Sequence, residues 1–156
     1  MMSRTEQMRT VNSLLTTLDD LNWESYVEIS KAISYIDETQ LNSELAESAS
    51  RYTYWSGMLA LAKKKLDDAK LEFDQHVAIM SEETRADLPS KGVKTTDKKV
   101  MAVVESKPLY RAARESVIEA ELKYNLMRNL TESLKHRKDM LVQMSANSRK
   151  ETDLYT

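Results

Sequence analysis

Apolar residues recur every three to four positions between Leu41 and Met80, and this spacing predicts one long helix. In a heptad register the a positions are all apolar or aromatic, and most d positions are small or aromatic. The a positions are Leu45, Tyr52, Leu59, Leu66, Phe73 and Met80, and the d positions are Ser48, Trp55, Ala62, Ala69 and His76. A stripe sustained at a period of 3.5 residues is typical of a coiled-coil seam, which requires a partner helix.

A second stripe with the same period predicts that partner within residues 109–146. It reads Tyr110, Ala113, Val117, Ala120, Tyr124, Met127, Thr131, Leu134, Lys138 and Leu141. Pro89 and Gly92 break the chain between the two stripes, while Pro108 suits a first helical turn because its missing N–H needs no partner there. Two stripes of matching length predict an antiparallel hairpin, which we place in register with Ala86 opposite Leu109.

The remaining segments complete a four-part organisation. Apolar residues between Val11 and Ile36 predict one or two short helices with a break near Asp20. Asp37 or Thr39 can cap the long helix that follows, and Thr96 or Asp97 can start a short helix in the hairpin tip. We therefore divide the chain into an acidic N-terminal segment (1–36), a first long helix (37–88), a basic tip with a short helix (89–108), and a second long helix with a basic tail (109–156).

Composition supports an all-α fold. Two glycines and two prolines in 156 residues leave few turn formers for short strands. With 41% hydrophobic and 31% charged residues, long helices that bury a seam fit better than a large globular core. Neither long helix hides its apolar face alone, so we expect an oligomeric, coiled-coil-like hairpin with short N-terminal helices. The absence of cysteine and of any apolar run near ~20 residues predicts a cytoplasmic protein without a membrane segment.

The net charge of −2 conceals an asymmetry along the chain. Residues 1–50 hold nine acidic and three basic residues, a net charge of −6, so the rest of the chain carries +4. An acidic head on a basic body is compatible with separate partners, with self-association, or with no binding role.

Three groups of basic residues are candidates for binding a phosphate backbone. The first comprises Lys63, Lys64 and Lys65; the second comprises Arg85, Lys91, Lys94, Lys98 and Lys99 at the tip; the third comprises Lys135, His136, Arg137 and Lys138, followed by Arg149 and Lys150. In the predicted register, residues 63–65 face residues 130–132, so the first and third groups merge into one basic patch. Alternatively, the first group is a solvated helix face and the third complements the dipole at a helix C-terminus.

Aromatic residues near these groups have two interpretations. Tyr52, Tyr54, Trp55 and Tyr124 can stack on unpaired bases where they are exposed. Three of them occupy seam positions, which favours packing in the core. The sequence holds no glycine-rich phosphate loop or nucleophile motif, and His76 and His136 lack metal-site spacing, so we expect neither an enzyme nor a metal or other cofactor.

Two stretches resemble a known family. The first stretch comprises Asp37-Glu38-Thr39, Leu45, Tyr52-Thr53-Tyr54-Trp55 and the lysine-rich helix that follows. The second comprises Val117, Glu121, Tyr124 and Leu134 to Gln143. Both are similar to phage recombination mediators of the UvsY type. The resemblance covers about residues 37–150. The family's basic motif with paired tyrosines has only a partial counterpart in residues 69–74, where Lys70 is the one basic residue that can be carried over.

The resemblance implies a non-enzymatic, all-helical subunit in a ring of six or seven copies, acting in the cytoplasm of a bacterial host. It also implies binding to single-stranded DNA, to a recombinase and to a single-strand-binding protein, in phage recombination, replication and DNA repair. Our leading hypothesis is therefore an accessory protein that binds single-stranded DNA without sequence preference and assists recombinase loading. The alternatives are a structural coiled-coil scaffold and a protein-only adaptor that contacts its partner through the acidic head.

Overall fold

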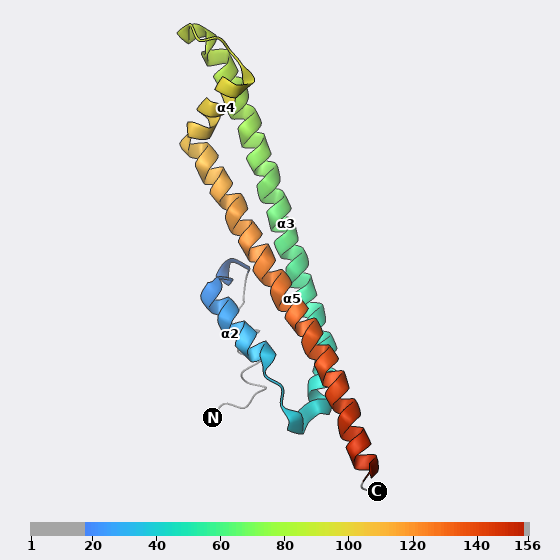
Figure 1. The fold of residues 1–156 in the computed structure, drawn as a ribbon. Coiled ribbons are helices and arrows are strands. Elements are labelled where there is room, and N and C mark those ends of the chain that lie inside the picture. Colours follow the sequence, from blue (N-terminus) through green and yellow to red (C-terminus); the bar gives the residue numbers. More distant parts are fainter. Residues whose placement is uncertain (1–17, 155–156) are drawn as a thin grey trace. The chain divides into compact units, whose positions relative to one another are not determined.

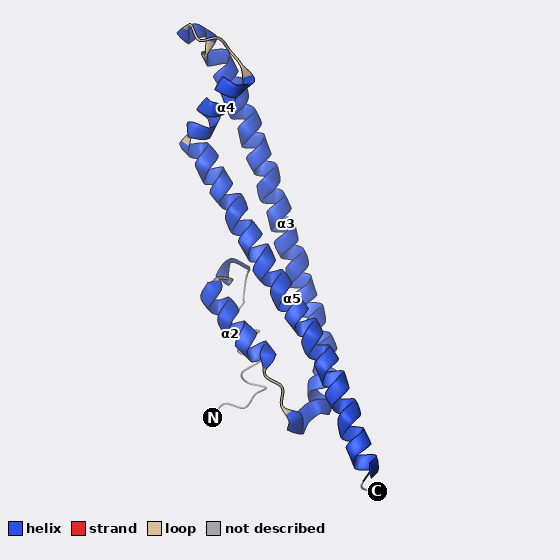
Figure 2. Ribbon diagram, viewed as in Figure 1, coloured by secondary structure: helices blue, strands red, loops and turns tan. Residues whose placement is uncertain are grey.

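The fold of the described residues is all-α, as the composition and the apolar spacing predict. A computed structural model describes residues 18–154, with side chains described as far as Glu151, and no strand occurs among these residues (Figures 1 and 2). The element order is a 3-10 helix at Leu18–Asp20, α2 at Trp23–Ser34, a 3-10 helix at Glu38–Gln40, α3 at Leu41–Asp87, a 3-10 helix at Pro89–Lys91, α4 at Asp97–Ser106 and α5 at Pro108–Leu154.

The chain forms two compact units, and their boundary falls within the long helices instead of at the loops. Unit 1 comprises Met1–Ala62 with Lys123–Thr156, and unit 2 comprises Lys63–Leu122. Both α3 and α5 contribute to each unit.

Local chemistry explains where the shorter elements begin and end. Asn22 caps α2 through a capping box, in which its side chain accepts from the Ser25 N–H and Ser25 Oγ accepts from the Asn22 N–H. Thr96 caps α4, and Pro108 opens α5, where its missing N–H leaves no donor unsatisfied. Gly92 has φ +67° at the end of the Pro89–Lys91 turn, a left-handed conformation that glycine adopts without strain.

The core of unit 1 is built from three helices. Trp55 and Ala62 of α3 pack with Leu126, Met127, Leu130 and Leu134 of α5, and α2 adds Ile29 and Ile33. Leu18 and Leu21 extend this cluster at the chain's first described residues. Most predicted seam positions of both helices are buried or half-buried. Tyr52 differs, because 40% of it is exposed, and Lys138 is exposed while its neighbour Arg137 is buried.

The core of unit 2 shows why the predicted register of α3 and α5 is wrong. Val100 and Val104 of α4 pack against Met80 and Leu88 near the end of α3. Because α4 covers that end, α5 starts opposite an earlier part of α3, and the rings of Phe73 and Tyr110 meet edge-on with centroids 5.3 Å apart. The predicted register placed Phe73 opposite position 122, about three helical turns further along α5.

Candidate nucleic-acid interface

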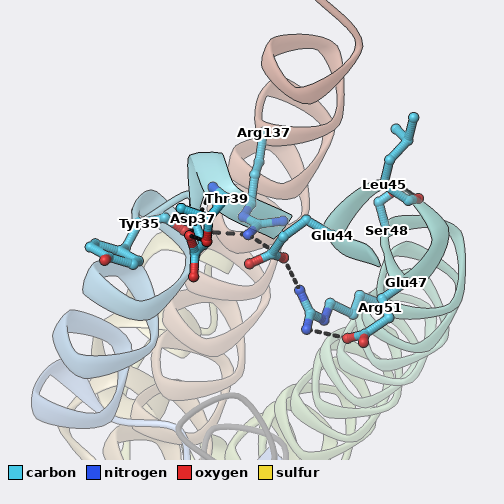
Figure 3. Close-up of polar contacts among 9 residues, drawn as sticks. All are labelled: Tyr35, Asp37, Thr39, Glu44, Leu45, Glu47, Ser48, Arg51 and Arg137. Atoms are coloured by element: carbon cyan, nitrogen blue, oxygen red, sulfur yellow. Dashed lines mark hydrogen bonds and ion pairs between the residues drawn. The ribbon is translucent and has the colours of Figure 1, made fainter. Parts of the chain in front are cut away.

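Arg137 lies at the centre of a buried polar network in unit 1. Only 5% of Arg137 is exposed, and its Nη2 donates to Glu44 Oε2 at 2.7 Å and to the Tyr35 carbonyl oxygen at 3.3 Å (Figure 3). The same Glu44 oxygen accepts from Arg51 Nη1 at 3.0 Å, and Arg51 Nη2 donates to Glu47 Oε2 at 2.5 Å. The network therefore connects the start of α3, the residue that directly follows α2, and the C-terminal half of α5.

The charge state of Glu44 follows from this network. Burial of the Glu44 carboxyl acts to raise its pKa, but hydrogen bonds and positive charge from Arg137 and Arg51 outweigh burial and hold the pKa below its ordinary value. Glu44 is therefore ionised at neutral pH, with 12% of its side chain exposed. Both guanidinium groups stabilise the ionised carboxylate at this position.

The segment that connects α2 with α3 is held by a turn of its own and by Arg137. Asp37 Oδ1 accepts from the Thr39 N–H at 3.0 Å and from Thr39 Oγ1 at 2.6 Å, which closes the turn before α3. Arg137 holds the carbonyl of Tyr35 directly before this turn. Arg137 is therefore a structural residue, and its predicted place on an exposed DNA-binding surface is wrong.

The inward orientation of Arg137 determines which cations of α5 face solvent. At 100° per residue, Lys135 lies almost opposite Arg137 on the helix. Arg128, Lys135, Lys138 and Arg149 are exposed and fall within about a quarter of the helix circumference. We call these four residues the basic stripe. Among the described residues, none of the four forms an ion pair.

The basic stripe is long and contains an apolar residue. Arg128 and Arg149 are separated along the helix axis by about 32 Å, at 1.5 Å per residue. Val142 lies between Lys138 and Arg149 on the same face and is 47% exposed. His136 and Lys150 are also exposed on α5, outside the stripe. Arg128 is not among the predicted basic residues, although it stands seven residues before Lys135, a spacing that returns to the same helix face.

The first predicted basic group lies on α3 in unit 2, and much of its charge is paired. Lys63 Nζ lies 2.6 Å from Asp67 Oδ1, and Lys64 Nζ lies 2.5 Å from Asp68 Oδ2. The hydrogen bond and charge of Asp68 raise the pKa of Lys64. Lys65 and Lys70 are also exposed. These lysines belong to unit 2 and the third group belongs to unit 1, so the merged patch stays a prediction.

The second predicted group surrounds the start of α4. Lys91 pairs with Asp87 and holds the pKa of that carboxyl below its usual range, and Arg85 pairs with Asp97 at 2.8 Å. The side chains of Lys94, Lys98 and Lys99 are exposed and form no ion pair with any described residue. Three of the predicted tip residues thus remain available to an anion.

The aromatic candidates divide between packing and exposure. Trp55 is 2% exposed and packs in the unit 1 core, with Tyr124 half-buried beside that cluster. Tyr52 and Tyr54 are 40% and 42% exposed, and the Tyr54 ring meets Trp55 edge-on at 5.8 Å. The structure therefore leaves only Tyr52 and Tyr54 of the four in positions where a base could stack.

Two further classes of site are absent from the described part of the chain. Within residues 18–154, no three His, Cys, Asp or Glu side chains are grouped to hold a metal ion. The described helices include none with the length and apolar character needed to cross a membrane.

No protein-family model, curated protein or solved structure matches this chain.

Proposed function

We propose that this protein is a non-enzymatic accessory factor that binds single-stranded DNA without sequence preference and assists the loading of a recombinase. The observation that carries the DNA-binding part is the basic stripe on α5, with four exposed cations on one helix face and no ion-pair partner among the described residues. Cations arranged along a rigid helix contact phosphates without reading bases, so such binding is independent of sequence.

Further exposed cations and the family resemblance fit the same function. Lys94, Lys98 and Lys99 offer a second set of exposed cations in unit 2. Lys135 and Lys138 of the stripe lie in the stretch Leu134 to Gln143 that resembles UvsY-type mediators. That resemblance alone supports the recombinase, the single-strand-binding protein and the phage context as parts of the proposal.

The finer architecture is part of this proposal. We propose that α3 and α5 form one antiparallel, coiled-coil-like hairpin and that several copies assemble. Large apolar side chains on the outer faces support assembly, because monomeric proteins rarely expose many of them together. They include Leu61, Leu71, Ile79, Ile118 and Leu122, each more than half exposed. By resemblance, the assembly is a ring of six or seven subunits.

A second candidate function is a scaffold or adaptor that binds only proteins. The observation that favours it is the pairing of Lys63 with Asp67 and of Lys64 with Asp68, which removes much of the basic character of α3. The overall net charge of −2 also supplies no general attraction for nucleic acid.

Fluorescence anisotropy with a labelled oligo-dT distinguishes the two candidates. For DNA binding we expect log affinity to fall linearly with log salt, by about 0.7 for each phosphate neutralised on a single strand. Substituting Lys135→Ala, Lys138→Ala and Arg149→Ala together should lower the affinity and reduce this slope by about 2. The matched control is Lys63→Ala with Lys64→Ala, two cations already paired with aspartates, which should change the slope little.

Light scattering on each variant shows whether the assembly is intact. If the parent protein does not bind oligo-dT at low salt, the DNA-binding proposal is wrong and the scaffold or adaptor remains. If the parent binds and the control variant loses affinity while the stripe variant does not, the DNA surface lies on α3 instead.

A further inference from the structure

The segment from Leu18 to Asp37 is fixed to unit 1 at both of its ends. At its start, Lys123 Nζ of α5 donates to the Asp19 carbonyl oxygen at 3.2 Å. At its end, Arg137 donates to the Tyr35 carbonyl oxygen, and Figure 3 shows the Tyr35 ring directed away from the polar network. Between these anchors, Ile29 and Ile33 of α2 are 0% and 2% exposed in the core. The outward face of α2 is therefore held on a rigid support.

That outward face carries large aromatic side chains in solvent. Trp23 is 67% exposed and Tyr35 is 61% exposed, at opposite ends of α2. The Trp23 ring stacks on Tyr26, which is half-buried against the unit 1 core, with centroids 5.5 Å apart and an interplanar angle of 26°. A shallow hollow between the two ends is lined by Tyr26, Val27, Ser30, Lys31, Ser34 and Tyr35. We call Trp23, Tyr26, Val27 and Tyr35 the aromatic face of α2.

Exposed and pre-positioned aromatic rings are typical of binding surfaces. Tyrosine and tryptophan are enriched at the centres of protein interfaces, where they bury a large area with little loss of side-chain freedom. A surface that is already rigid also avoids most of the ordering cost of association.

The charge around the aromatic face decides between nucleic acid and protein. Residues 18–40 contain six carboxylates, Asp19, Asp20, Glu24, Glu28, Asp37 and Glu38, against one lysine, a net charge of −5. Two cations of α5, Lys123 and Arg137, lie against the two ends of this segment, and the net charge stays negative when both are included. The single lysine, Lys31, is paired with Glu28 at 3.0 Å. Base stacking on these rings would bring phosphates into a negative field, which opposes binding. A positively charged protein segment is attracted by the same field.

We propose that the aromatic face of α2 is a docking surface for a cationic segment of a partner protein, in which Lys or Arg residues flank apolar anchors. The apolar anchors would cover Val27 and the Trp23 and Tyr35 rings, and the cations would lie near Glu24 and Glu28. This inference does not rest on nucleic-acid binding by α5, because no residue of the basic stripe belongs to the aromatic face.

Intrinsic fluorescence supplies a direct test, since the chain contains two tryptophans, one exposed and one buried. The full-length protein is titrated with a synthetic tryptophan-free peptide that carries leucines at helical spacing between lysines and arginines. We expect saturable binding, a shift of Trp23 emission to shorter wavelength and protection from acrylamide quenching. Raising the salt concentration should weaken binding several-fold. A peptide with glutamate in place of each basic residue should not bind.

Variants locate the surface. Tyr35→Ala and the pair Glu24→Gln with Glu28→Gln should each weaken peptide binding at least fivefold, with the helix content and Trp55 emission unchanged. The matched control is Tyr54→Ala, an exposed aromatic of α3 in the same unit, which should bind the peptide as the parent does.

Four outcomes would overturn the proposal. They are the absence of binding by the cationic peptide, equal binding of the acidic peptide, and unchanged affinity in both the Tyr35 and the glutamate variants. The fourth is a Trp23 that is already shielded from acrylamide before peptide is added. Shielding that increases with protein concentration would identify a second copy as the occupant, and shielding lost on deletion of residues 1–17 would identify the chain's own N-terminal segment. None of these results depends on the oligo-dT measurement.

Discussion

Replacing Arg137 with methionine tests the assignment of this residue to structure instead of DNA contact. Methionine keeps most of the length of the side chain but removes the guanidinium. The variant loses the 2.7 Å ion pair with Glu44 and the hydrogen bond to the Tyr35 carbonyl. Glu44 keeps Arg51 at 3.0 Å, so its carboxylate is left with one of its two cationic partners.

The expected cost in unfolding free energy follows from these losses. Removing one partner of a fully buried ion pair costs about 3–5 kcal/mol, chiefly because the other charge stays buried. Glu44 retains Arg51 and some solvent contact, which reduces that contribution to about 2 kcal/mol. Loss of the hydrogen bond to Tyr35 adds about 1 kcal/mol. We therefore expect Arg137→Met to destabilise unit 1 by about 3 kcal/mol.

Urea unfolding followed by Trp55 emission, in a Trp23→Phe background, measures this change because Trp55 lies in the core of unit 1. The control is Lys138→Ala, an exposed neighbour on the same helix, which should change stability by less than about 0.5 kcal/mol. Equal effects of the two substitutions would refute the reasoning, since they would show that the buried pair contributes nothing specific.

The dependence of the unfolding free energy on pH tests the same network independently. The folded-state pKa of Glu44 is lowered, so its contribution to stability is fully present above the unfolded-state pKa, about 4.3, and is lost as pH falls through the folded-state pKa. In Arg137→Met the lowering is reduced. The variant should therefore lose less stability than the parent between pH 5 and acid pH, and a steeper loss would contradict this account.

Three further substitutions test two glycine positions and one helix cap. Gly57→Ala should stabilise the protein by about 0.5–1 kcal/mol, because Gly57 lies within α3 and an added Cβ meets no atom within 4 Å. Gly92→Ala should destabilise it by about 1 kcal/mol, because Gly92 has φ +67°, a conformation that alanine adopts only with strain. Thr96→Ala should cost about 1 kcal/mol, because Thr96 Oγ1 accepts from the Lys99 N–H at 3.3 Å and caps α4. Thermal unfolding measures all three, and an opposite sign for either glycine substitution would contradict the backbone argument.

Most of the secondary structure is predictable from local signals. The break between the long helices follows from Pro89 and Gly92, the start of α4 from Thr96, and the start of α5 from Pro108, because each acts on backbone groups within a few residues. The paired state of Lys63 and Lys64 was equally accessible, since an aspartate follows each lysine at i+4.

The orientation of the C-terminal half of α5 was not predictable from local signals. After the seam residue Leu134, the next buried position can be Lys138, four residues on, or Arg137, three residues on. Both lie near the buried face of the helix. The ion pair with Glu44, which is 93 residues away in the sequence, determines that Arg137 is the buried cation. The register error has the same character, because it depends on α4 packing against Met80 and Leu88. Tertiary contacts thus outweighed a local pattern that allowed two solutions.

The position of Arg137 links the two surfaces proposed in unit 1, and the Arg137→Met variant separates their requirements. Its guanidinium anchors the Tyr35 end of the aromatic face, so the variant should dock the cationic peptide less tightly. The basic stripe should respond differently, because Lys135 and Lys138 remain exposed as long as α5 stays helical. Oligo-dT affinity of the folded variant should therefore stay within about twofold of the parent, since no phosphate contact is removed. A large loss of DNA affinity with unit 1 still folded would show that Arg137 itself reaches the DNA, against its buried placement between Glu44 and Tyr35.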